Sequence, residues 1–126
     1  MKTLQLIAMA VLVISAASAH ALDIKPYSAT ALAEAQKADK PVALHFRADW
    51  CPTCRAQDKV LESLKSEPGL DLTVLAVNYD TERELKKQFN IRTQSTLVVL
   101  HGKKETSRSI DATSASGLRA ALKTAL

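Results

Sequence analysis

The sequence predicts an α/β protein in which strands alternate with helices. Short runs rich in Val, Leu and Phe, typical of buried strands, are separated by segments whose apolar residues recur every three or four positions. Two further strand-like runs, within 95–110, are joined at Gly102 and predict a hairpin. Alternating strands and helices favour parallel pairing with both faces covered, so we expect a central mixed sheet flanked by helices on both faces, with a C-terminal hairpin and helix.

The first 21 residues have the pattern of a secretory signal peptide. Lys2 precedes an apolar run over 6–14, and a stretch of small residues then ends at Ala21. The run is about half of the roughly 20 residues that a membrane-spanning helix needs, so a retained anchor is the weaker alternative. We therefore predict cleavage after about Ala21, a periplasmic location and one domain over residues 22–126.

Local patterns place the elements in the first half of the domain. An alanine-rich helix stops at Pro41, and a run of Val, Leu and Phe after that proline indicates a buried strand. The next helix repeats Ala56, Val60 and Leu64 every four residues, so we expect this face to be buried. The predicted ranges are helix 29–40, strand 41–48, helix 52–66 and strand 71–80.

The second half contains a short helix, the hairpin and a last helix. Thr81 and Glu84 fit a T-x-x-E capping box, which predicts that the short helix opens there. The hairpin at 95–110 follows, and Ser114 begins the last helix. Its apolar side carries Leu118, Leu122 and Ala125.

Composition excludes several classes of partner. The formal charge is +4, and loss of Lys2 with the signal peptide lowers it by one, but the basic residues are scattered. Aromatic residues make up 4% of the chain, so we expect no stacking platform and no nucleic-acid partner. Nothing in the sequence resembles a dimerisation stalk before the domain, so we expect a monomer.

The stretch FRADWCPTCRAQD contains both cysteines of the chain, Cys51 and Cys54. A disulfide across so short a loop would stabilise the fold by only about 2 kcal/mol, which makes a purely structural role the weaker reading. A closed zinc site needs four ligands, and the other nitrogen ligands of the domain, His45 and His101, fit no common spacing. The prediction therefore assigns no metal.

Redox chemistry fits the pair better for a physical reason. Cys51 falls just before a helix whose first turn is Pro52-Thr53-Cys54, and proline is well suited to the first helical position. Free N–H groups and the helix dipole favour a thiolate on Cys51. Cys54, one turn further on, is placed to attack a mixed disulfide and release the substrate.

The segment ADWCPTCR, preceded by the strand VALHF, resembles the active site of the thioredoxin superfamily. The resemblance covers most of the mature chain and implies a nucleophile at Cys51, a resolving thiol at Cys54 and a shielding aromatic at Trp50, with no cofactor. Pro52 and Thr53 between the cysteines are similar to the exported thiol reductases of cytochrome c maturation. The acidic and glycine-rich signatures of that branch are not evident.

Several positions depart from the family pattern. His45 replaces a buried aspartate beneath the second cysteine, and it is a candidate to accept the proton of Cys54 near neutral pH, or else a bonded core histidine. Arg47 replaces a common aromatic and, with Asp49 and Arg55, makes the rim of the site charged.

Ser95 aligns with the proline that the family places opposite the cysteines in a cis peptide. A cis bond before a residue other than proline costs roughly 2.5–4 kcal/mol, so we predict a trans Gln94–Ser95 bond. The serine would bring a hydroxyl near the sulfurs. Since the proline discourages metal binding in the family, Ser95 could open the two thiols to a soft ion such as Cu(I).

The leading hypothesis is an exported thiol–disulfide oxidoreductase that acts on protein thiols and disulfides. The 105 residues of 22–126 leave no room for the inserted helical domain of exported oxidases, which favours a reductase or electron relay supplied by a membrane electron donor. The alternatives are a binding or sensor module that holds a soft metal ion through both thiols, and a disulfide oxidase.

Overall fold

The computed structural model describes residue 12 and residues 21–126. The predicted signal peptide lies almost wholly outside the described residues, so the structure does not test it. In the described part of the chain, no helix has the length and apolar character that crossing a membrane requires.

Strands and helices alternate along the domain, as expected from the sequence. The elements are β1 (Asp23–Pro26), α1 (Ala29–Lys37), β2 (Pro41–Arg47), α2 (Pro52–Leu64), β3 (Thr73–Asn78), α3 (Arg83–Gln88), β4 (Thr96–His101), β5 (Lys104–Ile110) and α4 (Ala115–Lys123).

Within residues 21–126 the strands form one mixed sheet in the order β1-β3-β2-β4-β5. The strands β1, β3 and β2 are parallel, whereas β4 is antiparallel to both β2 and β5. The parallel strands β2 and β3 are joined through α2, and the hairpin β4–β5 turns at Gly102, whose φ of 59° is readily adopted by glycine. The predicted α/β class and terminal hairpin are confirmed.

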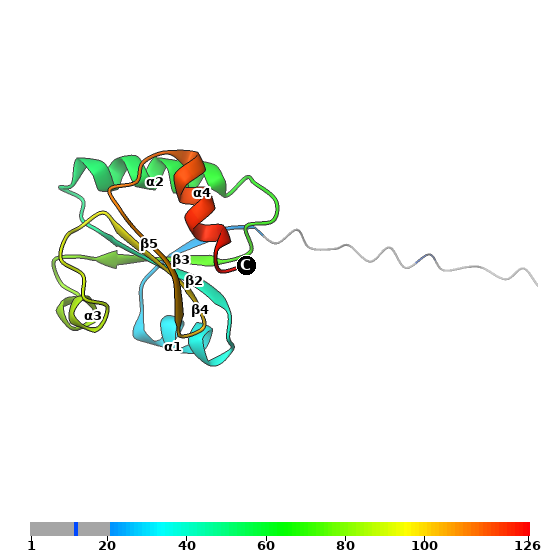
Figure 1. Ribbon diagram of the computed structural model, residues 1–126, viewed down its shortest axis with the longest axis horizontal. Helices are drawn as coiled ribbons and strands as arrows, with labels where there is room; N and C mark the ends of the chain where they lie inside the picture. Colours follow the sequence, from blue (N-terminus) through cyan, green and yellow to red (C-terminus); the bar gives the residue numbers. More distant parts are fainter. Residues whose placement is uncertain (1–11, 13–20) are drawn as a thin grey trace, which may run out of the picture.

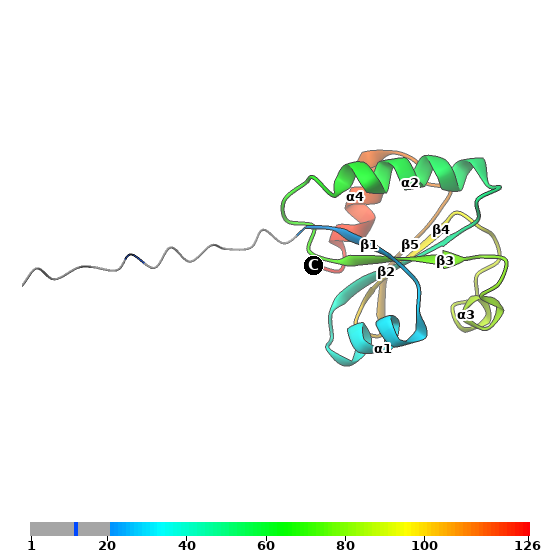
Figure 2. The same cartoon turned by 180° about the vertical axis from the view of Figure 1, so that it is seen from behind.

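Helices cover both faces of the sheet. Helices α2 and α4 lie on one side, and α1 and α3 lie on the other (Figures 1 and 2). Successive side chains of a strand point to opposite faces, so on β2 the residues Leu44 and Phe46 face α1 and α3, whereas Ala43 and His45 face α2. The α1/α3 face is packed by a cluster of apolar side chains: Leu32, Val42, Leu44, Phe46, Leu75, Val77, Leu85, Ile91, Val98 and Leu100.

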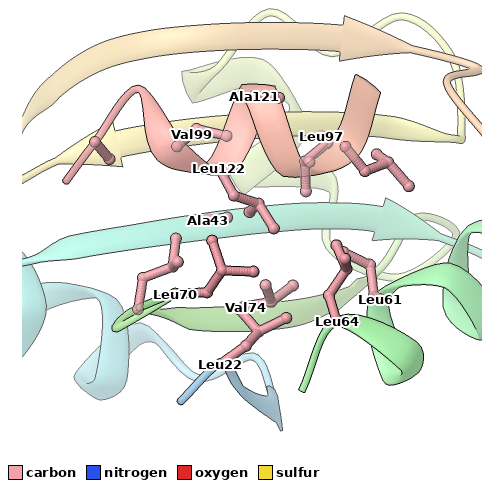
Figure 3. Packing of buried hydrophobic residues seen from close by; sticks show 13 residues of the cluster. Leu22, Ala43, Leu61, Leu64, Leu70, Val74, Leu97, Val99, Ala121 and Leu122 are labelled. Atoms are coloured by element: carbon pink, nitrogen blue, oxygen red, sulfur yellow. The ribbon is translucent and has the colours of Figure 1, made fainter. Parts of the chain in front are cut away.

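The α2/α4 face has its own apolar cluster, in which Leu61 and Leu64 of α2 and Leu122 of α4 meet Ala43 and Val74 of the sheet (Figure 3). The buried face of α2 agrees with the sequence expectation at Leu64 but not at Ala56. It consists of Cys54, Gln57, Leu61 and Leu64, while Ala56 is exposed and Val60 is half-buried. The helix is therefore rotated so that a polar residue, Gln57, faces the sheet.

Two local predictions are corrected by the structure. Strand β1 was missed because its sequence, DIKP, is polar and ends in proline, and only Ile24 is partly buried in this edge strand. The capping box does not form, since α3 is capped at Glu82, with no side-chain cap hydrogen bond. Helix α4 does begin after Ser114, whose Oγ accepts the N–H of Gly117 at 3.1 Å.

Candidate active site

The two cysteines lie where β2 ends and α2 begins. Cys51 is the N-cap residue of α2, and its Sγ accepts the backbone N–H of Cys54 at 3.2 Å. Pro52 occupies the first turn, where its missing N–H leaves no donor unpaired. Both cysteines are free thiols and both are buried. The sequence thus places a sulfur at the positive end of the helix dipole, where a thiolate is stabilised.

The environment separates the two thiols chemically. Burial raises the pKa of the Cys51 thiol, but hydrogen bonds from the Cys54 and Ser95 side chains and from the backbone at Cys54 and Thr53 hold that pKa below its ordinary value. For Cys54, burial and the neighbouring Cys51 sulfur raise the pKa, and hydrogen bonds with Ser95 and the backbone of Ala48 offset this only in part. Cys51 is therefore the more acidic thiol.

Ser95 lies against both sulfurs from the opposite side of the site. Its Oγ is 3.2 Å from Cys51 Sγ and 3.1 Å from Cys54 Sγ. The residue is 1% exposed, so water does not compete for these contacts. The expectation that its hydroxyl lies near the sulfurs agrees with this geometry, and the peptide bond before it is trans, as predicted.

The backbone of Ser95 has a left-handed conformation, with φ of 63°. Such a conformation is uncommon for residues other than glycine and persists where neighbouring groups hold it. The Ser95 N–H donates to Phe46 O at 2.9 Å, and its carbonyl accepts from Asp111 N at 3.0 Å and from Gln57 Nε2 at 3.1 Å. Every polar atom of Ser95 is therefore engaged.

Gln57 connects Ser95 to the interior of the α2 side of the sheet. Its Nε2 donates to the carbonyls of Ser95 and Ala112, at 3.1 and 3.0 Å, and its Oε1 lies 2.7 Å from His45 Nε2. Because the amide nitrogen of Gln57 donates to two carbonyls, the amide oxygen is the atom that accepts a hydrogen bond from the histidine. This side chain, which is fully buried, ties α2, β2, Ser95 and the segment after β5 together.

This arrangement determines the proton position on His45. Because Gln57 Oε1 accepts, His45 Nε2 carries a hydrogen, and the other ring nitrogen, Nδ1, lies 3.7 Å from Asp58 Oδ1. Burial lowers the pKa of His45, while the Gln57 hydrogen bond and the Asp58 carboxylate oppose that shift. The nitrogen with a free lone pair faces Asp58, so direct proton transfer from Cys54 to His45 does not fit this geometry. The alternative reading, a hydrogen-bonded core histidine, does.

Charged residues surround the site, as the sequence suggests. Arg47 Nε lies 3.0 and 3.1 Å from the two oxygens of Asp58, and its Nη1 lies 3.0 Å from Asp49 Oδ1. Trp50 is 57% exposed, and its Nε1 donates to Asp80 Oδ2 at 2.8 Å. A surface hollow of about 310 Å³ beside the cysteines is lined by Arg47, Asp49, Trp50 and Asp80 among others.

The donor set for a metal is sparse. Within residues 21–126 no three His, Cys, Asp or Glu side chains gather in a way that could hold a metal ion. The two sulfurs, with Ser95 Oγ beside them, are the only soft ligands that the geometry of this site would offer. Soft-metal binding through both thiols therefore stays a sequence-based prediction without added support.

The structure brings most of the sequence-derived site residues together: Cys51, Cys54, Trp50, Pro52, Thr53 and Ser95. His45 reaches them only through Gln57 and Ser95. Gln57 was missed because a glutamine between apolar helix positions usually faces solvent. The available signal was the three- and four-residue spacing of Cys54, Gln57, Leu61 and Leu64.

Fold and site together define a dithiol protein: two thiols of unequal acidity at a helix N-terminus, at the end of a central strand. The sequence matches the thioredoxin family model over residues 25–124. It is 33% identical over 76 residues to thioredoxin from Mycobacterium bovis, covering 60% of this chain and 66% of that one. It is 30% identical over 89 residues to the bifunctional thioredoxin reductase/thioredoxin of Mycobacterium leprae, covering 71% of this chain and 19% of that protein.

Solved structures agree with the sequence comparison. Trxlp from Edwardsiella tarda is 38% identical and superposes with a TM-score of 0.74, covering 79% of this chain and 98% of that one. A mutant thioredoxin from Halobacterium salinarum, 21% identical with a TM-score of 0.69, shows the same fold and covers 86% of this chain and 93% of that one. The chain belongs to the thioredoxin family.

Proposed function

We propose that this protein is an exported thiol–disulfide oxidoreductase that acts on protein disulfides, with Cys51 as nucleophile and Cys54 as resolving thiol. The observation that carries the proposal is that Cys51 Sγ caps α2, where a backbone N–H and the Ser95 hydroxyl approach it. These donors favour the Cys51 thiolate at neutral pH, and the thiolate is the reactive form in disulfide exchange.

The reaction proceeds in two exchanges. The Cys51 thiolate attacks one sulfur of a substrate disulfide, forms a mixed disulfide and releases the first substrate thiolate. Cys54 then loses its proton to that thiolate or to water and attacks Cys51 Sγ, which releases the second substrate thiolate. Two electrons pass from the dithiol to the substrate, and the cysteines end as a disulfide without any cofactor.

Protein substrates fit the surroundings of the cysteines better than a small ligand does. The hollow is lined by charged and polar residues together with small apolar ones, and Trp50 in its lining stays largely exposed. An exposed aromatic next to a charged rim is a suitable contact surface for an extended polypeptide, because such rings are enriched at protein interfaces.

The direction of electron flow is proposed to be reductive. In the described domain, only the six-residue α3 lies between β3 and β4, without an inserted helical domain. The hydrogen bonds to Cys51 favour the opposite, oxidising direction, because they stabilise the reduced dithiol and so raise the reduction potential of the Cys51–Cys54 couple. A reductant in an oxidising compartment needs a renewed supply of electrons, and we propose a membrane electron donor for that role.

The reduction potential of the Cys51–Cys54 couple tests the direction. Metal-free mature protein is equilibrated against glutathione or dithiothreitol buffers, and the oxidised fraction is measured. A value near or below about −230 mV supports a reductant or electron relay. A value near about −120 mV, at the oxidising end of the family range, would make the protein a disulfide donor.

The cellular part of the proposal has its own test. A Cys54→Ser variant lacks the resolving thiol, so it should accumulate mixed disulfides at Cys51 in the periplasm. A Cys51→Ser/Cys54→Ser variant is the matched control. Recovery of the full-length chain only from the cytoplasm, with residues 1–21 intact, would contradict export.

A further inference from the structure

We propose that the Ser95 hydroxyl is a shared hydrogen-bond donor that serves the Cys51 thiolate first and the Cys54 thiolate second. When Cys51 enters the mixed disulfide, the hydroxyl turns from the Cys51 sulfur to the Cys54 sulfur. This inference rests on the proposed function and assigns a catalytic role to a residue that contacts both reacting atoms.

One arrangement satisfies both Ser95 contacts when Cys51 is ionised. Ser95 Oγ lies within 3.2 Å of Cys51 Sγ and 3.1 Å of Cys54 Sγ, but a hydroxyl has one hydrogen. If Cys51 is a thiolate, it can only accept, so the hydroxyl donates to Cys51. In this arrangement the Cys54 S–H group donates to Ser95 Oγ in place of Cys51 Sγ, and both Ser95 contacts are satisfied.

Formation of the mixed disulfide changes the stronger acceptor. The Cys51 sulfur is then neutral and bonded to the substrate sulfur, so it is a weak acceptor. Rotation of the Ser95 hydroxyl toward Cys54 makes it a donor to the sulfur that must ionise. Hydrogen bonds to charged groups are stronger than those between neutral groups, so this donor favours the Cys54 thiolate. The Cys54 proton passes to the first substrate thiolate or to water, which keeps the exchange balanced.

The neighbouring groups leave Ser95 as the side chain suited to this task. His45 keeps its Nε2 hydrogen on Gln57, and its other nitrogen faces Asp58. Gln57 uses both hydrogens of its Nε2 on carbonyl groups, one of which belongs to Ser95. The Ser95 backbone is held at its N–H and its carbonyl, so the hydroxyl can rotate while its oxygen stays between the sulfurs.

A stopped-flow experiment with dithiobis(nitrobenzoate) separates the two uses of the hydroxyl. Reduced mature protein is mixed with one equivalent of the reagent between about pH 5 and 10, a range that brackets the ordinary cysteine pKa. Attack by Cys51 releases the first nitrothiobenzoate, and attack by Cys54 on the mixed disulfide releases the second. The product leaves as a stable thiolate, so each phase reports ionisation of the attacking cysteine and not protonation of the leaving group.

The test variant is Ser95→Gly, because glycine accepts φ of 63° while the hydroxyl is lost. At about pH 6.5 we expect both phases to slow by about tenfold, the effect of losing one hydrogen bond to a charged sulfur. As pH rises toward about 10 and the cysteines ionise, the rates should approach those of the wild type. A purely structural defect would instead slow the reaction at every pH.

Three further variants keep the interpretation unambiguous. Ser95→Ala also lacks the hydroxyl but retains a Cβ, so it should reproduce the pH shift of Ser95→Gly if it folds. Ser109→Ala removes a buried serine Oγ that has no partner among the described residues, and it should leave both phases unchanged. Asn90→Gly relaxes a left-handed residue, with φ of 52°, in the turn after α3. It too should react like the wild type.

The outcomes distinguish this inference from the function on which it rests. A Ser95→Gly protein with wild-type rates for both phases at about pH 6.5 would overturn the shared donor. Slowing of the first phase alone would overturn the reversal toward Cys54. A wild-type protein that releases only one nitrothiobenzoate would overturn the resolving role of Cys54 itself, and the inference with it.

Discussion

The two faces of the sheet are built on different principles. The face under α1 and α3 is apolar, and side chains such as Leu44 and Phe46 fill it by shape alone. The face under α2 has an apolar cluster of its own, but near the cysteines it holds the hydrogen-bonded chain His45–Gln57–Ser95. A mixture of apolar residues of suitable size can fill a core, whereas a buried polar chain needs each partner in place. The first face supplies stability, and the second positions the sulfurs.

The largest effect is expected from a cavity in the apolar face. Leu44 is fully buried, so Leu44→Ala should lower the free energy of unfolding by about 2–5 kcal/mol. Urea unfolding followed by circular dichroism measures it. The folded fraction should keep its wild-type thiol reactivity, because Leu44 faces away from α2. A strong change in the reactivity of folded Leu44→Ala would remove the division of roles between the two faces.

A loss of stability of similar size, together with a change in thiol reactivity, is expected in the polar chain. Gln57→Leu removes the partner of His45 Nε2 and of Ala112 O, and unsatisfied buried groups destabilise by about 1–3 kcal/mol each. Loss of the Gln57 bond to Ser95 O should also loosen the placement of the hydroxyl and slow alkylation of Cys51 by iodoacetamide at about pH 6.5. If the variant loses stability but alkylates at the wild-type rate, then Gln57 supports the fold and not the sulfurs.

Acid should weaken the polar face selectively. The pKa of His45 lies below its ordinary value of 6.5 because of burial, so below pH 6.5 the unfolded chain binds the proton more readily than the folded one. The stabilising contribution of neutral His45 is therefore complete above pH 6.5 and is lost as pH falls toward the folded-state pKa. Urea unfolding at about pH 7 and about pH 5 should show this loss in the wild type and a smaller one in His45→Leu.

A kinetic prediction concerns whether His45 accepts the proton of Cys54. Since Nε2 of His45 is held by Gln57, His45→Ala should leave the pH dependence of mixed-disulfide release between about pH 6 and 8 unchanged. The second phase of nitrothiobenzoate release provides the measurement. A shift of that profile to higher pH, with Ser95 intact, would restore His45 as the proton acceptor of Cys54.

The smallest effect is expected at the edge of the polar face. Asp58 is 36% exposed and pairs with Arg47, so Asp58→Asn should change the free energy of unfolding by about 0.5 kcal/mol or less. Because the Asp58 carboxylate raises the pKa of His45, its loss should lower that pKa further and extend the acid-sensitive range to lower pH. Urea unfolding at several pH values would reveal an unchanged range if Asp58 had no electrostatic effect on His45.

The sequence was sufficient for the apolar parts of this architecture. Runs of branched and aromatic residues mark β2, β3 and β4, and the Cys-Pro-Thr-Cys spacing marks the start of α2, because each signal is local. Strand β1 was not predicted because an edge strand needs few apolar residues. Its pairing partner, β3, is also distant in the sequence. The predicted capping box does not form, because Glu82 and not Thr81 is the N-cap residue of α3.

The site was predictable at the sulfurs and not in the chain behind them. Cys51, Cys54 and Ser95 could be assigned from the motif and its alignment with the family. The role of Gln57 depends on how α2 is rotated about its axis. Apolar periodicity leaves that rotation uncertain by about one residue position. The proton position on His45 depends in turn on Gln57, so this prediction required the three-dimensional network.

The left-handed backbone at Ser95 also restricts how this loop can evolve. A proline ring holds φ near about −65°, whereas Ser95 has φ of 63° and gives its N–H to Phe46 O. A single codon change to the proline usual in the family would oppose the local conformation and remove that donor. Serine at this position is thus part of a different loop and not a substituted side chain. Descendants of this protein would have to rebuild several residues together to adopt the proline form of the loop.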